Sequence, residues 1–297
     1  MHVLNRHRRG SGKPAIKLLL LAVLLVTTLV IVCLAILHCA DYNKPAIVNL
    51  QLTEYQNSSA LAKVVGTMAS YGIKPYTIFV SEGVVEQNCS LIRNLYDNGY
   101  EIAAFGYNVS PTGSLVPITN MPFAAQESMI NSTKTAIERC TGQGPEGFRS
   151  QGFSKDNTTN KILKDLGFGW DSSFVTNFDP EASAIPYYSN SLGFYVVSIQ
   201  GIIENHSVFV LCDRACQGSG KTPAQWRNLV ENYFRTDQAK GVPFVTEFHP
   251  GFLVSNTVWW DNFTQILSWL RQQDATYVTT QQMINECAAP AKNSSCA

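Results

Sequence analysis

The chain has 297 residues, of which 45% are hydrophobic and 15% are charged, a composition that argues against intrinsic disorder. Its net charge of zero conceals an asymmetry, because residues 1–40 carry five of the 22 basic residues and none of the 22 acidic ones. The remainder therefore has a net charge of 17 − 22 = −5, which gives no reason to expect nucleic-acid binding.

The N-terminal region contains an apolar run of membrane length, Leu18–Leu37, with twenty residues and no charge. As a helix it would span about 30 Å, the thickness of a hydrocarbon core. The basic residues before it predict a cytosolic tail over residues 1–17 and a single-pass type II membrane protein of the cell surface or secretory pathway. The alternative is a cleaved signal peptide and a secreted product, but Ile36–Ala40 lacks the pattern of a cleavage site. We therefore expect an uncleaved signal-anchor followed by a linker over residues 38–44.

Two features after the apolar run indicate an oxidising, glycosylating compartment. Eight N-glycosylation sequons occur there, where chance would give about three: Asn57, Asn88, Asn108, Asn131, Asn157, Asn205, Asn262 and Asn293. Six cysteines also follow, an even number that predicts three disulfides: Cys89, Cys140, Cys212, Cys216, Cys287 and Cys296. A zinc site at Cys212-x-x-x-Cys216 is the rival interpretation, but no second cysteine or histidine pair has metal-ligand spacing. The simplest pairing joins Cys212 to Cys216.

The outer region alternates short β-branched or apolar runs with amphipathic stretches. In chain order we predict strand 46–53, helix 58–70, strand 74–80, helix 90–98, strand 101–105, a helix including 129–140, strand 147–150, helix 157–166, strand 169–173, strand 194–202, helix 223–236, strand 242–248, helix 259–272, strand 275–278 and helix 280–287. This series predicts an α/β fold, a distorted (β/α) barrel of about seven parallel strands, with a doubly wound open sheet as the alternative. In a barrel, functional residues follow the carboxyl ends of the strands.

At those strand ends the sequence resembles the polysaccharide deacetylase (NodB-homology) family, most closely its animal chitin deacetylase group. The resemblance covers residues 45–290, leaves 291–297 as a tail, and is carried by residues 147–153 (GFRSQGF), 170–173 (WDSS) and 244–250 (FVTEFHP). It implies removal of acetyl groups from N-acetylglucosamine polymers. The family uses a divalent metal such as zinc, held by an aspartate and two histidines, with an aspartate base and a histidine acid.

The positions that match the family's metal ligands hold no ligand side chain. Glu54 matches the base aspartate, whereas Tyr55 matches the metal-binding aspartate and Phe105 and Val109 match the two histidines. Phenylalanine and valine offer a metal no lone pair, and a neutral tyrosine is a poor ligand for a hard cation. We therefore expect no cofactor.

Other parts of the family's site have counterparts in this sequence. Arg149 matches the arginine that orients the base, although the following proline is absent; Asp171 matches the strand-end aspartate, and His249 matches the histidine acid. Each also has a structural explanation. Arg149 could form a buried ion pair with Glu54 or Asp171, His249 could be a hydrogen-bonded histidine at a strand end, and Glu54 could be solvated.

The resemblance and its gaps together predict a deacetylase-like domain without catalytic activity, retained to bind an N-acetylglucosamine-type glycan such as chitin or a cell-surface protein. The alternatives are an active de-N-acetylase with a divergent site on Glu54, Arg149, Asp171 and His249, and a structural or adhesive surface glycoprotein. A glycan on Asn108 would crowd the cleft. Five aromatic residues are candidates for a sugar groove, although most should be core: Tyr187, Tyr188, Phe194, Trp259 and Trp260.

Overall fold

The computed structural model describes residues 26–27, 30, 45–109 and 116–288, and divides the chain into two units, residues 1–44 and 45–297. Of the predicted anchor, Leu18–Leu37, only residues 26, 27 and 30 are described, and they are helical. The basic tail, the linker, the C-terminal tail, Asn293 and Cys296 lie outside the described residues. Within the described part of the chain, no helix combines the length and apolar character needed to cross a membrane.

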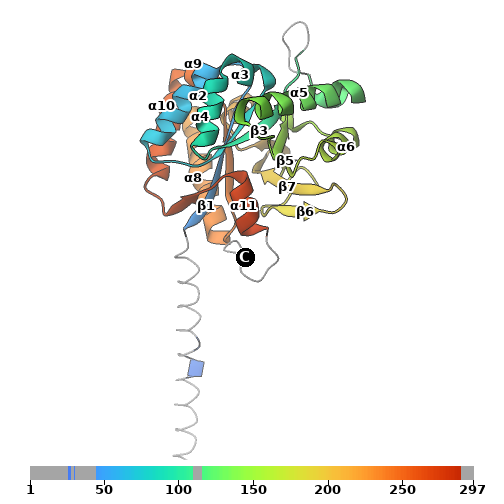
Figure 1. Ribbon diagram of the computed structural model, residues 1–297. Helices are drawn as coiled ribbons and strands as arrows, with labels where there is room; N and C mark the ends of the chain where they lie inside the picture. Colours follow the sequence, from blue (N-terminus) through green and yellow to red (C-terminus); the bar gives the residue numbers. More distant parts are fainter. Residues whose placement is uncertain (1–25, 28–29, 31–44, 110–115, 289–297) are drawn as a thin grey trace, which may run out of the picture. The chain divides into compact units, whose positions relative to one another are not determined.

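The second unit is built on one sheet of nine strands (Figure 1). The strands are β1 (Ala46–Glu54), β2 (Thr77–Val80), β3 (Glu101–Gly106), β4 (Gly147–Ser150), β5 (Trp170–Val175), β6 (Tyr187–Ser189), β7 (Phe194–Ile199), β10 (Phe244–Phe248) and β11 (Ala275–Tyr277). They are ordered β10-β1-β2-β3-β4-β5-β7-β6, with β11 also paired to β1. All the pairs are parallel except β6 with β7. The predicted α/β fold with a parallel sheet is confirmed.

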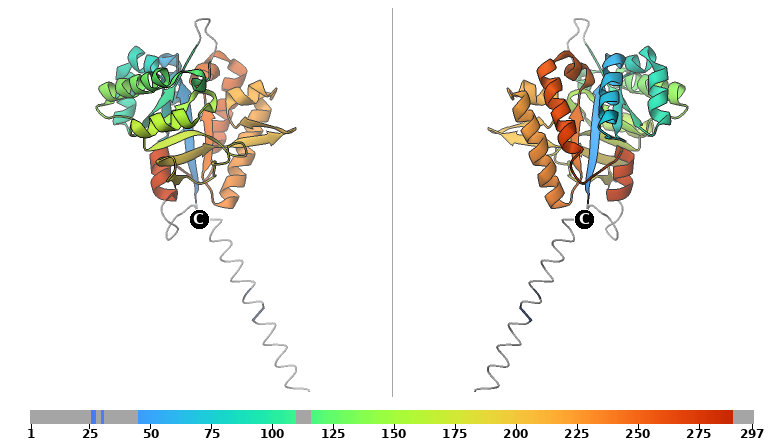
Figure 2. Two further views of the ribbon diagram at one scale, coloured as in Figure 1. Left: turned by 90° about the vertical axis from the view of Figure 1, so that its right-hand side faces the viewer. Right: turned by 90° about the vertical axis from the view of Figure 1, so that its left-hand side faces the viewer.

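The helices connect successive strands and lie mainly around the outside of the sheet (Figures 1 and 2). They are α2 (Ser58–Ser70), α3 (Glu82–Gln87), α4 (Cys89–Asp97), α5 (Phe123–Thr141), α6 (Asn157–Asp165), α7 (Asp213–Gly218), α8 (Pro223–Lys240), α9 (Pro250–Ser255), α10 (Thr257–Leu270) and α11 (Thr280–Cys287). Side-chain caps fix several of their starts: Asn57 begins α2, and Thr222 and Thr279 form capping boxes on α8 and α11.

The curled sheet does not close into a complete barrel by strand pairing. Its gap lies between β7 and β10 and is bridged by the chain that follows the small hairpin of β8 (Gly201–Glu204) and β9 (Ser207–Val210). Leu211 donates its N–H to the carbonyl of Gln200 at 2.8 Å, and Cys212 forms an isolated parallel bridge with Glu247. The predicted strand 194–202 is therefore confirmed for Phe194–Ile199 and wrong in continuing to residue 202. The chain leaves the sheet at Gly201, where a Cβ atom would lie only 1.9 Å from a backbone oxygen.

The two faces of β1 show how the sheet positions polar groups. Val48, Leu50 and Leu52 point outward into the apolar core between the sheet and the helices. The alternate residues point to the interior, and three of them, Asn49, Gln51 and Thr53, are polar and at most 1% exposed. Because such buried polar groups require hydrogen-bond partners, these residues indicate a hydrogen-bonded network inside the sheet.

Candidate functional site

Two pockets adjoin at the carboxyl ends of the strands. The aromatic pocket, of about 410 Å³, is lined mainly by residues at the ends of β1, β3, β4, β9 and β10. The polar pocket, of about 440 Å³, lies over the connections that follow β1 and β10. Both are lined by Tyr55, Arg214 and His249, and the Arg214 guanidinium lies 5.6 Å from the centre of the Tyr55 ring. The predicted location of the site, after the strand ends, agrees with these pockets.

Aromatic rings occupy two of the three positions that the sequence resemblance aligned with the family's metal ligands, Tyr55 and Phe105. Tyr55 and Phe105 stack with ring centres 5.8 Å apart, and Tyr107 stacks on Tyr55 at 4.6 Å. All three line the aromatic pocket, whereas Val109 is 39% exposed and lines neither pocket. The structure thus brings two of the three positions together, and their ring faces do not fit a divalent cation, which needs oxygen, nitrogen or sulfur donors.

Glu54 is a buried, fully hydrogen-bonded carboxylate. Its Oε1 accepts N–H bonds from Tyr55, Gln56 and Asn57 at 2.9–3.0 Å, and its Oε2 accepts one from Gly251 at 2.6 Å. The side chain is only 3% exposed, so the expectation of a solvated glutamate is wrong. These four bonds fix the carboxylate, whose Oε2 accepts a single bond and lies in the wall of the polar pocket. Glu54 thereby ties the connection between β1 and α2 to the start of α9.

Arg149 is held inside the sheet by Glu247, and not by Glu54 or Asp171 as expected. Its Nη1 lies 2.9 Å from Glu247 Oε1, with both side chains at most 3% exposed. It also donates to Ser172 and Gln51. Burial lowers the pKa of Arg149, and Glu247 opposes that change. Burial would raise the pKa of Glu247, but the charges of Arg149 and His249 outweigh it and lower that pKa.

Asp171 on β5 is linked to β4 through hydrogen bonds of Ser173. Its Oδ1 accepts bonds from the backbone N–H and hydroxyl of Ser173 at 3.0 and 2.5 Å, and the Ser173 hydroxyl oxygen accepts the N–H of Ser150 at 2.8 Å. Among the described residues, its Oδ2 has no hydrogen-bond partner. Burial raises the pKa of Asp171 to about 6, despite its bonds to Ser173. Asp171 lines neither pocket.

The residue that orients His249 is Asp213, which the sequence interpretation missed. Asp213 Oδ1 lies 2.6 Å from Nδ1 of His249, and its Oδ2 accepts the His249 backbone N–H at 2.8 Å. The Nε2 of His249 lies 3.7 Å from Glu247 Oε1. Burial would lower the pKa of His249, but the Glu247 and Asp213 carboxylates raise it above its usual value. A bound imidazole with one nitrogen held and the other facing a pocket can bind a proton or a metal.

The cysteines only partly follow the predicted pairing. Cys89 and Cys140 form a disulfide, and Cys287 is also disulfide-bonded. Cys212 and Cys216 are free thiols instead of a bridge. The reason is that they face different interiors: Cys212 lies in the core inside the sheet, whereas Cys216 packs in the core beneath the outer helices.

The asparagines of the described sequons are all at least partly exposed. Five of the seven sequon asparagines are exposed, and Asn108 and Asn262 are half-buried. The backbone N–H of Asn108 donates to Gln151, a residue of the aromatic pocket wall, at 2.9 Å. Glycosylation stays a prediction.

None of the five suggested groove aromatics lines either pocket: Tyr187, Tyr188, Phe194, Trp259 and Trp260. The pocket aromatics Tyr107, Phe153 and Phe209 were not anticipated.

Comparisons with known proteins agree with this geometry. Residues 52–169 match the family model described as Polysaccharide deacetylase. No curated protein matches the chain. A structure assigned as a polysaccharide deacetylase from Mycobacterium smegmatis is 18% identical, with a TM-score of 0.61 over 82% of this chain and 91% of its own.

Two further solved structures share the fold at lower identity. A CE4 family pseudoenzyme from Bacillus anthracis is 12% identical, with a TM-score of 0.53 over 83% of this chain and 68% of its own. The PuuE allantoinase is 13% identical, with a TM-score of 0.62 over 81% of this chain and 90% of its own. At these identities the likeness shows the fold alone, and the family model adds the sequence match. Residues 52–169 are therefore similar in sequence to the polysaccharide deacetylase family, and the fold is that of solved proteins assigned to it.

Proposed function

We propose that this domain binds an N-acetylglucosamine-type glycan without deacetylating it. The observation that carries the proposal is the stack of Tyr55, Phe105 and Tyr107, which lines the aromatic pocket. Aromatic faces give flat, apolar contact area, and pyranose rings present a matching C–H surface. Polar side chains in the same wall, among them Gln151 and Arg214, would orient hydroxyl and acetamido groups.

Loss of the family reaction follows from the same geometry. The metal that polarises the amide has no ligands at the matching positions, and the carboxylate of Glu54 is held by four backbone N–H bonds. That a CE4 family pseudoenzyme shares the fold supports this possibility for the family. A protein partner at the same pocket is the alternative ligand.

A divergent de-N-acetylase is the second candidate function. The observation in its favour is the Asp213–His249 pair, which holds an imidazole at the edge of both pockets in the arrangement of a general acid. It requires a group that polarises the amide carbonyl, and the positions that match the family's metal ligands supply none. Glycan binding is therefore the better supported of the two functions.

The proposed setting is the outer face of a membrane, with residues 45–290 outside the cell or in the secretory lumen. The basic residues before Leu18–Leu37 support this orientation. The Cys89–Cys140 disulfide is typical of an oxidising compartment. A mature protein beginning near Asp41 would instead indicate secretion, and mass analysis of the native N-terminus distinguishes the two.

Calorimetric titration with chitooligosaccharides tests the binding proposal. Tyr107→Ala removes one half-buried ring of the pocket and should weaken binding by about 1–2 kcal/mol, or roughly 5–30-fold in Kd. Tyr188→Ala is the matched control, because Tyr188 is 50% exposed, packs against Tyr195 and lines neither pocket. Absence of binding by the unmodified protein, or equal loss in both variants, would contradict the proposal.

A further inference from the structure

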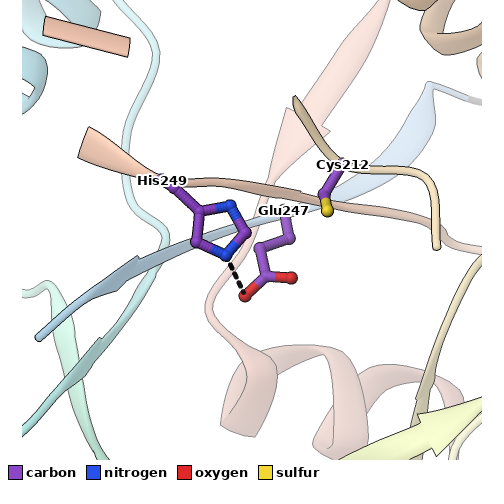
Figure 3. A group of neighbouring side chains, drawn as sticks. All are labelled: Cys212, Glu247 and His249. Atoms are coloured by element: carbon purple, nitrogen blue, oxygen red, sulfur yellow. Dashed lines mark ion pairs between the residues drawn. The ribbon is translucent and has the colours of Figure 1, made fainter. Parts of the chain in front are cut away.

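Three potential metal ligands converge on one wall of the aromatic pocket. Cys212 and Glu247 are buried, with 3% and 2% exposure, and the His249 side chain is 13% exposed. One ligand atom from each, the thiol sulfur, a carboxylate oxygen and a ring nitrogen, lies within 4.8 Å of the others (Figure 3). The group shares no residue with the positions that match the family's metal ligands.

The backbone holds these three side chains in place before any ligand binds. Cys212 and Glu247 form a parallel bridge across the gap in the sheet, and Glu247 and His249 are alternate residues at the end of β10. Cys212 also caps α7, where its sulfur accepts the N–H of Ala215 at 3.3 Å. The convergence therefore follows from the fold itself and not from flexible surface side chains.

Asp213 completes the arrangement around the histidine. Its carboxylate occupies Nδ1 of His249 at 2.6 Å, so Nε2 is the ring nitrogen that remains to bind a metal. A carboxylate on the distal nitrogen of a histidine ligand is the usual outer partner in zinc sites, where it fixes the ring and increases its basicity. Asp213 is fully buried, which keeps this contact away from solvent.

The charges also balance around a divalent ion. A thiolate at Cys212 and the carboxylates of Glu247 and Asp213 supply three negative charges, against one positive charge on Arg149, which contacts Glu247 at 2.9 Å. A divalent cation brings the sum of these four side chains and the ion to zero, and Arg214, which lines the pocket beside His249, adds one positive charge at the rim. A set of sulfur, nitrogen and oxygen donors suits zinc more than magnesium or calcium, which prefer oxygen alone.

We propose that Cys212, Glu247 and His249 bind one zinc ion, with Asp213 as the residue that positions His249. Cysteine coordinates as the thiolate, so its proton is released to solvent on binding. Three protein ligands leave a fourth position, and because all three residues line the aromatic pocket, that position is open to water or to a hydroxyl of a bound ligand. Coordination through Nε2 occupies the nitrogen with which His249 would act as an acid, so the ion and an acid role exclude each other.

The test measures metal directly and does not depend on glycan binding. The purified full-length chain, stripped with chelator, is titrated with zinc and with cobalt(II), whose absorption reports thiolate coordination. We expect one ion per chain and a thiolate-to-cobalt band. Cys212→Ser should abolish the band. Asp213→Asn should lower the affinity for zinc by roughly 10–100-fold, and Glu247→Gln and His249→Gln should each lower it by more than that.

Two controls keep the result specific. Cys216→Ser removes the other free thiol of the described residues, which lies in the outer core, and His206→Gln removes an exposed histidine on the β8–β9 turn. Both should retain full binding and the cobalt band. The proposal is overturned if the unmodified chain binds no zinc at micromolar concentrations, or if either control loses binding as the Cys212 variant does. Thermal melting of each variant shows whether a loss reflects unfolding.

Discussion

Replacing Arg149 by methionine should destabilise the protein strongly while leaving its surface unchanged. The guanidinium is 1% exposed, lies 2.9 Å from Glu247 and 4.1 Å from the centre of the Phe79 ring, and donates two bonds to Ser172. Methionine fills much of the volume but leaves a buried carboxylate without its cation. Removing one partner of a buried pair costs about 3–5 kcal/mol, so we expect a loss of that size in the free energy of unfolding.

The measurement is urea unfolding in the presence of chelator, so that no metal can replace the lost charge. Arg149→Met combined with Glu247→Gln removes the orphaned charge and should recover part of the loss. Lys161→Met is the control, because its ion pair with Asp165 is exposed and should matter by less than about 1 kcal/mol. A loss below about 1 kcal/mol for Arg149→Met would refute the view that this arginine holds the inside of the sheet together.

Two further predictions concern the metal positions and pH. Tyr55→Asp, Phe105→His and Val109→His together should add one bound metal ion per chain in elemental analysis, because Tyr55 and Phe105 already face each other; no additional ion would show that the local backbone has departed from the family's geometry. Burial, partly offset by Lys240, raises the pKa of Asp237 from 3.8 to about 7, so the folded state holds its proton more tightly and stability should fall as pH rises from about 4 to 7. Asp237→Asn should remove this decline and be more stable than the unmodified protein at pH 8 by roughly 2–4 kcal/mol. An equal free energy of unfolding of the unmodified protein at pH 5 and pH 8 would contradict the assignment.

The fold could be predicted from the sequence because its signals are local. The alternation of apolar strands with amphipathic helices gave the boundaries of α2, β4 and α11 as the structure has them. The failures have two different causes. The short helices α7 and α9 have too few turns for a periodic pattern, and the close backbone contact at Gly201, which ends β7, involves Thr176, 25 residues earlier.

The site was less predictable because its partners are distant in the sequence. Glu247 is 98 residues from Arg149, and Asp213 is 36 residues from His249. Only one local signal was available. Glu247 lies on β10 and His249 directly follows it, so these alternate residues face the same side of the sheet. The role of Glu54 could not be deduced at all, since it depends on Gly251 meeting the end of β1 from the far end of the chain.

The central claim is that this domain keeps the family's fold and pocket without its reaction. Its most direct test is acetate release from fully acetylated chitooligosaccharides by the purified chain, with chelator and with added zinc, cobalt or manganese. Amide hydrolysis needs a polarised carbonyl and a base, and a histidine acid alone supplies only about 10²–10⁴-fold. We predict no release above the rate without protein under any of these conditions. Release that depends on the protein and disappears in His249→Gln would contradict the claim and identify a divergent deacetylase.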